Sequence, residues 1–93
     1  MNHLDQDKKG RPIQTVLHLH GMGALPQYDG YTTDYIQPQQ FKDYYYPNDR
    51  AGTLWYHDHV MDFTARNINM GLAGFYLVED PHEAELNLPQ GEY

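Results

Sequence analysis

The chain has 93 residues, carries a formal charge of −7 from 13 acidic and 6 basic residues, and contains no cysteine. A chain of this length forms at most one small domain and is marginally stable without a metal or an oligomeric partner. The acidic balance argues against a nucleic-acid partner. The lack of cysteine excludes a disulfide framework, a thiolate metal site and a cysteine nucleophile.

Targeting signals are not visible in this sequence. The segment from Met1 to His20 lacks the apolar run of a signal peptide. No stretch approaches the roughly 20 apolar residues of a membrane span, so no membrane partner is expected and the compartment stays unknown. We expect a flexible N-terminal segment over 1–12, a truncated domain over 13–80 and a C-terminal tail over 81–93.

The first predicted strand covers residues 13–20, where polar and apolar side chains alternate. This period of two places alternate residues on opposite faces of a strand. His18 and His20 then share one face. The other face is expected to form the core and consists of Ile13, Thr15, Leu17 and Leu19.

Two further strands are predicted after a long loop over 24–40. Residues 41–46 are rich in tyrosine, and aromatic side chains favour the pleated surface of a strand. Residues 47–52 form a turn cluster, and residues 53–59 form the next strand. We therefore expect 41–46 and 53–59 to pair as a hairpin.

A helix is predicted over 60–70, because Met61, Ala65 and Ile68 recur at helical spacing. Gly71 suits the position just after its last turn. Residues 72–79 are almost continuously apolar, which predicts a final strand at the centre of the sheet. The fold class is thus mainly β, with about four strands and one short helix.

Two His-x-His pairs carry the chemistry of the sequence: His18 with His20, and His57 with His59. Residues i and i+2 of a strand point to one face, about 6.5–7 Å apart along the chain. A single such pair is more often solvated than metal-bound, but two pairs can line one pocket with four imidazoles. Late transition metals accept imidazole, and copper suits an all-histidine set better than zinc does. The i, i+2 spacing within each His pair also suits two neighbouring metal ions.

The residues around the two pairs carry a family resemblance. "TVLHLHG" at 15–21, "GTLWYHDH" at 52–59 and "GLAGFYLVEDP" at 71–81 together resemble the first copper-binding region of multicopper oxidases. The nearest members are bacterial laccases, bilirubin oxidase and phenoxazinone synthase. The resemblance implies a cupredoxin-like β-sandwich, of which this chain holds only a part, and a trinuclear copper cluster that reduces dioxygen to water.

The resemblance also implies roles for individual residues. His18 matches the type 2 copper ligand, and His20, His57 and His59 match type 3 ligands. Asp29 matches an acidic residue near the cluster, expected to orient a ligand or deliver protons, although an Asp-Gly pair is equally typical of a plain turn. Asp58 is expected to hydrogen-bond outward to solvent and to have no catalytic role.

The family's later copper motifs are missing from this sequence. They are His-x-x-His-x-His and His-Cys-His-x-x-x-His, and without cysteine no type 1 copper site is expected. Three routes to a complete site stay open. Copies of the chain could associate as a homo-oligomer, a complementing chain could carry the missing motifs, or one chain could bind one or two coppers at an open site.

These considerations predict a copper-dependent, laccase-like oxidoreductase that oxidises phenolic or aromatic substrates with O2 as acceptor. The alternative is a non-catalytic copper-binding module or fragment that needs a partner chain to complete a trinuclear site. An inert fold fragment that keeps the motifs is the third possibility. The missing cysteine weighs against the enzyme, whereas both complete His pairs weigh for metal binding.

Overall fold

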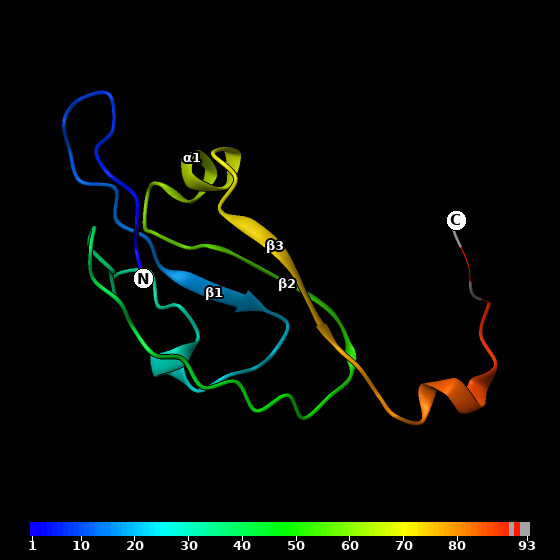
Figure 1. Cartoon of the computed structure of the whole chain (residues 1–93). Helices are drawn as coiled ribbons and strands as arrows, with labels where there is room; N and C mark the ends of the chain where they lie inside the picture. The colour runs from blue at the N-terminus through cyan, green and yellow to red at the C-terminus, as the bar shows by residue number, and fades with distance from the viewer. Residues whose placement is uncertain (90, 92–93) are drawn as a thin grey trace.

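The computed structural model describes residues 1–89 and 91, and within them three strands form one antiparallel sheet in the order β1-β2-β3 (Figure 1). The mainly β fold with one short helix is therefore confirmed. In chain order the elements are β1 (Leu17–His20), η1 (Pro26–Tyr28), β2 (Gly52–Asp58), α1 (Thr64–Asn69), β3 (Ala73–Val78) and η2 (Glu83–Leu86), where η marks a short 3₁₀ helix.

The central strand is β2, since β1 pairs with its C-terminal half and β3 pairs along almost its whole length. The prediction that the apolar run over 72–79 is central is wrong, because β3 lies at an edge of the sheet. Its side chains alternate in exposure, and Phe75 and Leu77 are 79% and 67% exposed. The apolar run therefore presents one face to the outside of this chain.

The tyrosine-rich segment over 41–46 is not a strand, so the predicted hairpin with 53–59 is wrong. β3 pairs with residues 52–57 of β2 and β1 pairs with residues 55–58, so most of the backbone that this segment would need is already paired. Tyr44 and Tyr46 instead turn inward and stack on each other, with ring centroids 6.0 Å apart, and Tyr46 meets the ring of Tyr76 on β3. Aromatic packing against the sheet replaces backbone pairing here.

The first strand begins at Leu17 rather than at Ile13. Thr15 exchanges backbone hydrogen bonds with Ile36 in the long loop, at 3.1 and 2.8 Å. The Val16 N–H donates to the side chain of Asp58 and not to a neighbouring strand. Val16 is fully buried, although the simple alternation assigns it to the histidine face.

The helix α1 is shorter than predicted and buries a polar residue. It begins at Thr64, and its buried side chain is Asn67, whereas Met61 precedes it and is 48% exposed. The apolar spacing that predicts the helix therefore does not mark its buried face. Gly71 does follow the last turn as predicted, with φ +101° and its N–H donating to the Ile68 carbonyl at 2.9 Å.

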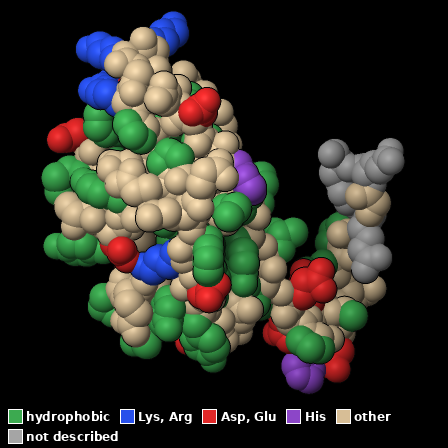
Figure 2. Space-filling model, turned by 60° about the vertical axis from the view of Figure 1, so that its left-hand side comes forward, with side chains coloured by type: hydrophobic (Ala, Val, Ile, Leu, Met, Phe, Trp, Pro, Cys, Tyr) green, Lys and Arg blue, Asp and Glu red, His purple; other side chains and the backbone are tan. Residues whose placement is uncertain are grey.

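The apolar core is small, and hydrophobic side chains are spread over the surface of the molecule (Figure 2). The N-terminal segment is joined to the residues of this core by Asn2, whose side-chain amide donates to the carbonyls of Ile13 and Ile36. The mobility expected for 1–12 and the domain division at 13 and 80 stay predictions. The buried apolar side chains are Ile13, Val16, Leu19, Met22, Ile36 and Val60.

The chain after β3 leads away from the sheet and carries η2 at a distance from the rest of the fold (Figures 1 and 2). Among the described residues, no helix has the length and apolar character needed to cross a membrane.

Leu19 and Leu77 offer a matched test of this core. Leu19 is 1% exposed, so Leu19→Ala is expected to lower the free energy of unfolding by about 2–5 kcal/mol. Leu77→Ala removes the same atoms from a side chain that is 67% exposed and should change it by less than about 1 kcal/mol. Urea denaturation followed by circular dichroism measures both. Equal losses would contradict the assignment of the core.

Candidate metal centre

The register of β1 and β2 brings the two His pairs together on one face of the sheet. His18 lies directly opposite His57, and His20 lies opposite Trp55. Directly paired residues of antiparallel strands share a face, and so do residues two apart in one strand. The imidazole centroid of His18 is accordingly 5.4 Å from that of His20 and 5.1 Å from that of His57.

Three of the four predicted ligands form a compact donor set. One ring nitrogen each of His18, His20 and His57 can be chosen so that all lie within 4.8 Å of one another. His59 follows the last residue of β2, and its ring stacks on that of His18 with centroids 4.9 Å apart. His59 therefore borders the donor set without belonging to it.

Backbone carbonyls fix the tautomers of three imidazoles. The Nδ1 atom of His18 lies 2.6 Å from the carbonyl of Asp29, and that of His57 lies 2.8 Å from the carbonyl of Asp58. His59 makes the same contact with the carbonyl of Gly30 at 3.0 Å. A carbonyl can only accept, so each Nδ1 carries the proton and each Nε2 keeps a lone pair for a metal. This is the usual orienting device for histidine ligands.

His20 differs from the other three histidines. It is exposed, and within the described part of the chain its ring nitrogens have no hydrogen-bond partner. Its ring packs against Trp55, with centroids 5.6 Å apart, and Trp55 also covers His57 at 4.2 Å. His20 can therefore reorient towards a ligand more freely than its neighbours.

The loop that supplies two of these carbonyls packs directly on β1. Gly30 has φ +71°, a conformation that favours glycine, and a Cβ there would collide with the backbone carbonyl of Leu17. Only glycine permits this close approach, which places the carbonyl of Asp29 against His18 of β1 and that of Gly30 against His59, which follows β2. The Asp-Gly pair in the sequence signals a turn but gives no sign of this contact.

Asp29 meets His18 through its main chain more closely than through its carboxylate. The carboxylate Oδ1 lies 3.4 Å from the same Nδ1 atom, and the side chain is 45% exposed. The carboxylate is thus accessible to solvent while it borders the histidines. This position is compatible with either of the roles expected for it.

Asp58 does not point to solvent, and that expectation is wrong. Its side chain is 2% exposed and lies on the face of the sheet opposite the histidines. The face that carries Asp58 is closed by the start of β1 and by α1, so an outward orientation is not available. Its hydrogen bonds are described below, because they bear on how the histidines are held.

Two tyrosines close to the sheet have hydroxyl groups that are buried without a hydrogen-bond partner in the described part of the chain, those of Tyr44 and Tyr46. Burial raises the pKa of Tyr46 to about 12 and raises the pKa of Tyr44 as well. Both phenols therefore stay protonated at neutral pH and do not act as bases there.

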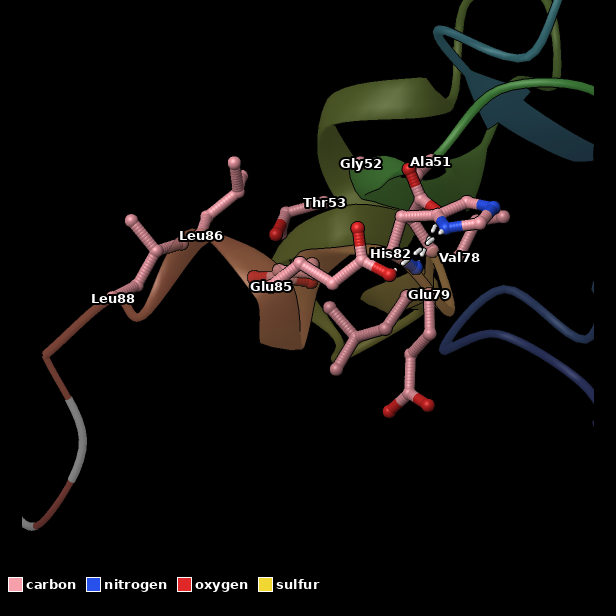
Figure 3. A pocket seen from close by; sticks show the side chains of 12 residues that line it. Ala51, Gly52, Thr53, Val78, Glu79, His82, Glu85, Leu86 and Leu88 are labelled. Carbon is pink, nitrogen blue, oxygen red and sulfur yellow. Dashed lines mark hydrogen bonds and ion pairs between the residues drawn. The ribbon is translucent and has the colours of Figure 1, made fainter.

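A concave region of about 640 Å³ lies between η2 and the ends of β2 and β3 (Figure 3). His82 and Glu85 both lie on the η2 side of this region, with Nδ1 and Oε1 3.7 Å apart, and both side chains are largely exposed (Figure 3). Within residues 1–89 and 91, the only group of three ligating side chains close enough for one metal is the set on β1 and β2. The cavity is therefore not a candidate metal centre.

The donor set suits copper on chemical grounds. It offers imidazole nitrogens and no thiolate, a set that copper(II) accepts readily. The site is also open, because His20 is exposed and Trp55 is 39% exposed. Three imidazoles would fill only part of a copper coordination sphere, which leaves room for other ligands.

Comparison with known proteins agrees with these features. The family model described as multicopper oxidase matches residues 2–83. Bilirubin oxidase from Albifimbria verrucaria is 53% identical over 76 residues, which are 81% of this chain and 13% of that protein. Laccase from Bacillus subtilis is 38% identical in an alignment of 102 positions that covers 100% of this chain and 20% of that protein.

Solved structures show the same relationship. A laccase-like multicopper oxidase from the lignin-degrading bacterium Ochrobactrum superposes with a TM-score of 0.78 at 30% identity, covering 97% of this chain and 19% of that chain. A multicopper oxidase from Aquifex aeolicus gives 0.67 at 26% identity over 90% of this chain and 18% of that chain. The chain thus spans a fifth or less of the relatives described here. By its sequence, its fold and its histidine-bearing sheet, the chain belongs to the multicopper oxidase family.

Proposed function

We propose that this chain supplies half of the histidine ligands of a copper centre in a laccase-like oxidase. The observation that carries the proposal is the convergence of His18, His20 and His57 on one sheet face, with His59 beside them. In this proposal all four bind copper. His18 takes the type 2 position, and the other three take type 3 positions.

The reaction proposed is the one-electron oxidation of phenolic or aromatic substrates with O2 as acceptor. Bound copper would supply the redox chemistry, accepting single electrons and passing them to dioxygen. The chain's own contribution is positional: the carbonyls of Asp29, Asp58 and Gly30 hold protons on three Nδ1 atoms, so that the Nε2 atoms face the metal. Each phenol would lose one electron and one proton, and the protons end in water.

The remaining ligands would come from outside this sequence. The histidine face continues into exposed apolar side chains, because Trp55 pairs with Phe75 in the sheet and Leu77 lies two residues further along β3. An exposed apolar surface of this kind marks a contact site. A second copy of the chain or a complementing chain could cover it and complete the cluster. A copper-binding module without catalytic activity is the alternative.

Copper binding can be tested with the exposed ligand. His20→Ala should keep the fold, because this side chain is exposed and has no hydrogen bonds in the described chain. It should lower the copper retained after a chelator wash by about tenfold or more, since one of few ligands is lost. His82→Ala removes a histidine that is 80% exposed and lies outside the site, so it should retain copper like the parent chain.

Metal analysis of the washed proteins gives the copper content, and an oxygen electrode with hydroquinone as donor gives the activity. Oxygen uptake that depends on His20 supports the oxidase. Copper binding without oxygen uptake supports the non-catalytic module. Absence of bound copper from the parent chain would refute both.

Asp29 permits a separate test of its carboxylate. Asp29→Asn keeps the main-chain carbonyl that accepts from His18, so copper content should not change. If the carboxylate delivers protons, oxygen uptake should fall by about a hundredfold, the size typical of a lost general acid or base. Asp43→Asn, at another exposed carboxylate, serves as the control. Equal oxygen uptake by both variants would show that the Asp29 carboxylate has no such role.

A further inference from the structure

Asp58 separates the two histidines of the second pair, and every polar group of this residue is engaged. Its N–H donates to the carbonyl of Leu72 at 3.0 Å, and its carbonyl accepts from His57 Nδ1. Its carboxylate is buried on the opposite face, where it is unable to ligate a metal held by the histidines. Its influence on the site must therefore act through the backbone and through neighbouring side chains.

The carboxylate joins the segment before the first His pair to the segment after the second. Oδ1 accepts from the Thr15 hydroxyl at 2.7 Å and from the Val16 N–H at 3.1 Å. Oδ2 accepts from the Val60 N–H and from the Asn67 side-chain amide, both at 3.0 Å. Val16 precedes His18 by two residues and Val60 directly follows His59, so one side chain spans both pairs.

Asn67 completes this arrangement from α1. It is 0% exposed, and its Oδ1 accepts from Arg66 Nε at 2.9 Å, which turns its NH2 group towards Asp58. The same NH2 group lies 3.3 Å from the carbonyl of Gln14. A buried asparagine in a short helix is thus explained by its partners rather than by packing.

The backbone of Val16 is hydrogen-bonded through both its N–H and its carbonyl. Its N–H donates to the Asp58 carboxylate, and its carbonyl accepts from the His59 N–H at 2.9 Å. A shift of the carboxylate would therefore displace Val16 relative to His59 and, two residues later, His18 relative to His57. These are the distances on which a shared metal site depends.

We propose that Asp58, supported by Asn67, is the positioning residue that sets the spacing between the two His-x-His pairs. The proposal rests on the function proposed above, since it concerns the same histidines, but it assigns them a support outside the ligand set. All four contacts need an acceptor, and a carboxylate supplies acceptors only. An asparagine at position 58 would turn its NH2 group against two donors.

The test compares three variants with the parent chain. Asp58→Asn replaces one acceptor oxygen by a donor, and Thr15→Val removes a single donor with little change of shape. Asn2→Ala is the control for the loss of buried hydrogen bonds, because Asn2 is buried and donates to the carbonyls of Ile13 and Ile36 but contacts neither Asp58 nor a histidine. Circular dichroism first establishes that each variant is folded, and if Asp58→Asn fails to fold, Thr15→Val decides.

Two readouts are taken: the imidazole ¹⁵N chemical shifts of the metal-free chain, and the affinity and electron paramagnetic resonance spectrum with copper(II) alone. Asp58→Asn and Thr15→Val should shift the His18 and His57 nitrogens and weaken copper binding about 10- to 100-fold, the range for orienting groups around ligands. Asn2→Ala should match the parent chain in both readouts.

Parent-like ¹⁵N shifts in folded Asp58→Asn and Thr15→Val would overturn the proposal, and so would equal changes in Asn2→Ala. The ¹⁵N readout needs no metal. If the parent chain binds no copper, the proposed function fails while the positioning role is still decided by the shifts.

Discussion

The carboxylate of Asp58 accepts hydrogen bonds from the two residues before β1, from Val60 after β2 and from Asn67 in α1. The apolar core alone is too small to fix these parts relative to one another, because hydrophobic contacts are not directional. Hydrogen bonds to a charged group contribute about 1.5–3 kcal/mol each, and they impose distances and angles. A buried charge left without such partners would be strongly unfavourable, which makes the arrangement cooperative.

Around this constraint, separate elements of the chain build the candidate metal centre. The register of β1 and β2 decides which histidines share a face. The loop at Asp29 and Gly30 decides which nitrogen of His18 and of His59 carries the proton. Burial of Asp58 below the sheet leaves the face above it to the imidazoles and to exposed aromatic and aliphatic side chains. The arrangement of the imidazoles therefore rests on the chain's own contacts, and the site is open on the side where further ligands would enter.

Local periodicity was a sufficient guide for some features. The i, i+2 spacing of the His pairs correctly placed His18 and His20 on one face, and the glycine at 71 marked the end of the helix. The flanking residues also identified the family correctly. These features depend on interactions within a few residues, which a single sequence records directly.

Other features depended on competition between distant segments. The tyrosines at 41–46 have strand propensity, but β1 and β3 already pair with most of the backbone of β2. The expectation that Asp58 hydrogen-bonds outward to solvent fails because its partners Thr15 and Val16 are distant in the sequence. Asn67 is not predicted to be buried, because the spacing of apolar residues gives no information on a polar side chain. The carbonyls that orient the histidines are main-chain atoms and leave no mark in the sequence.

The central claim is that three imidazoles are held with Nδ1 protonated and Nε2 free for a metal. Long-range ¹H–¹⁵N correlation spectra of the metal-free chain at a pH where the rings are neutral report the tautomer of each histidine directly. The structure predicts the Nδ1–H form for His18, His57 and His59. Protonation of Nε2 in these three residues would contradict the account, because the free nitrogens would then face the backbone and not the proposed copper.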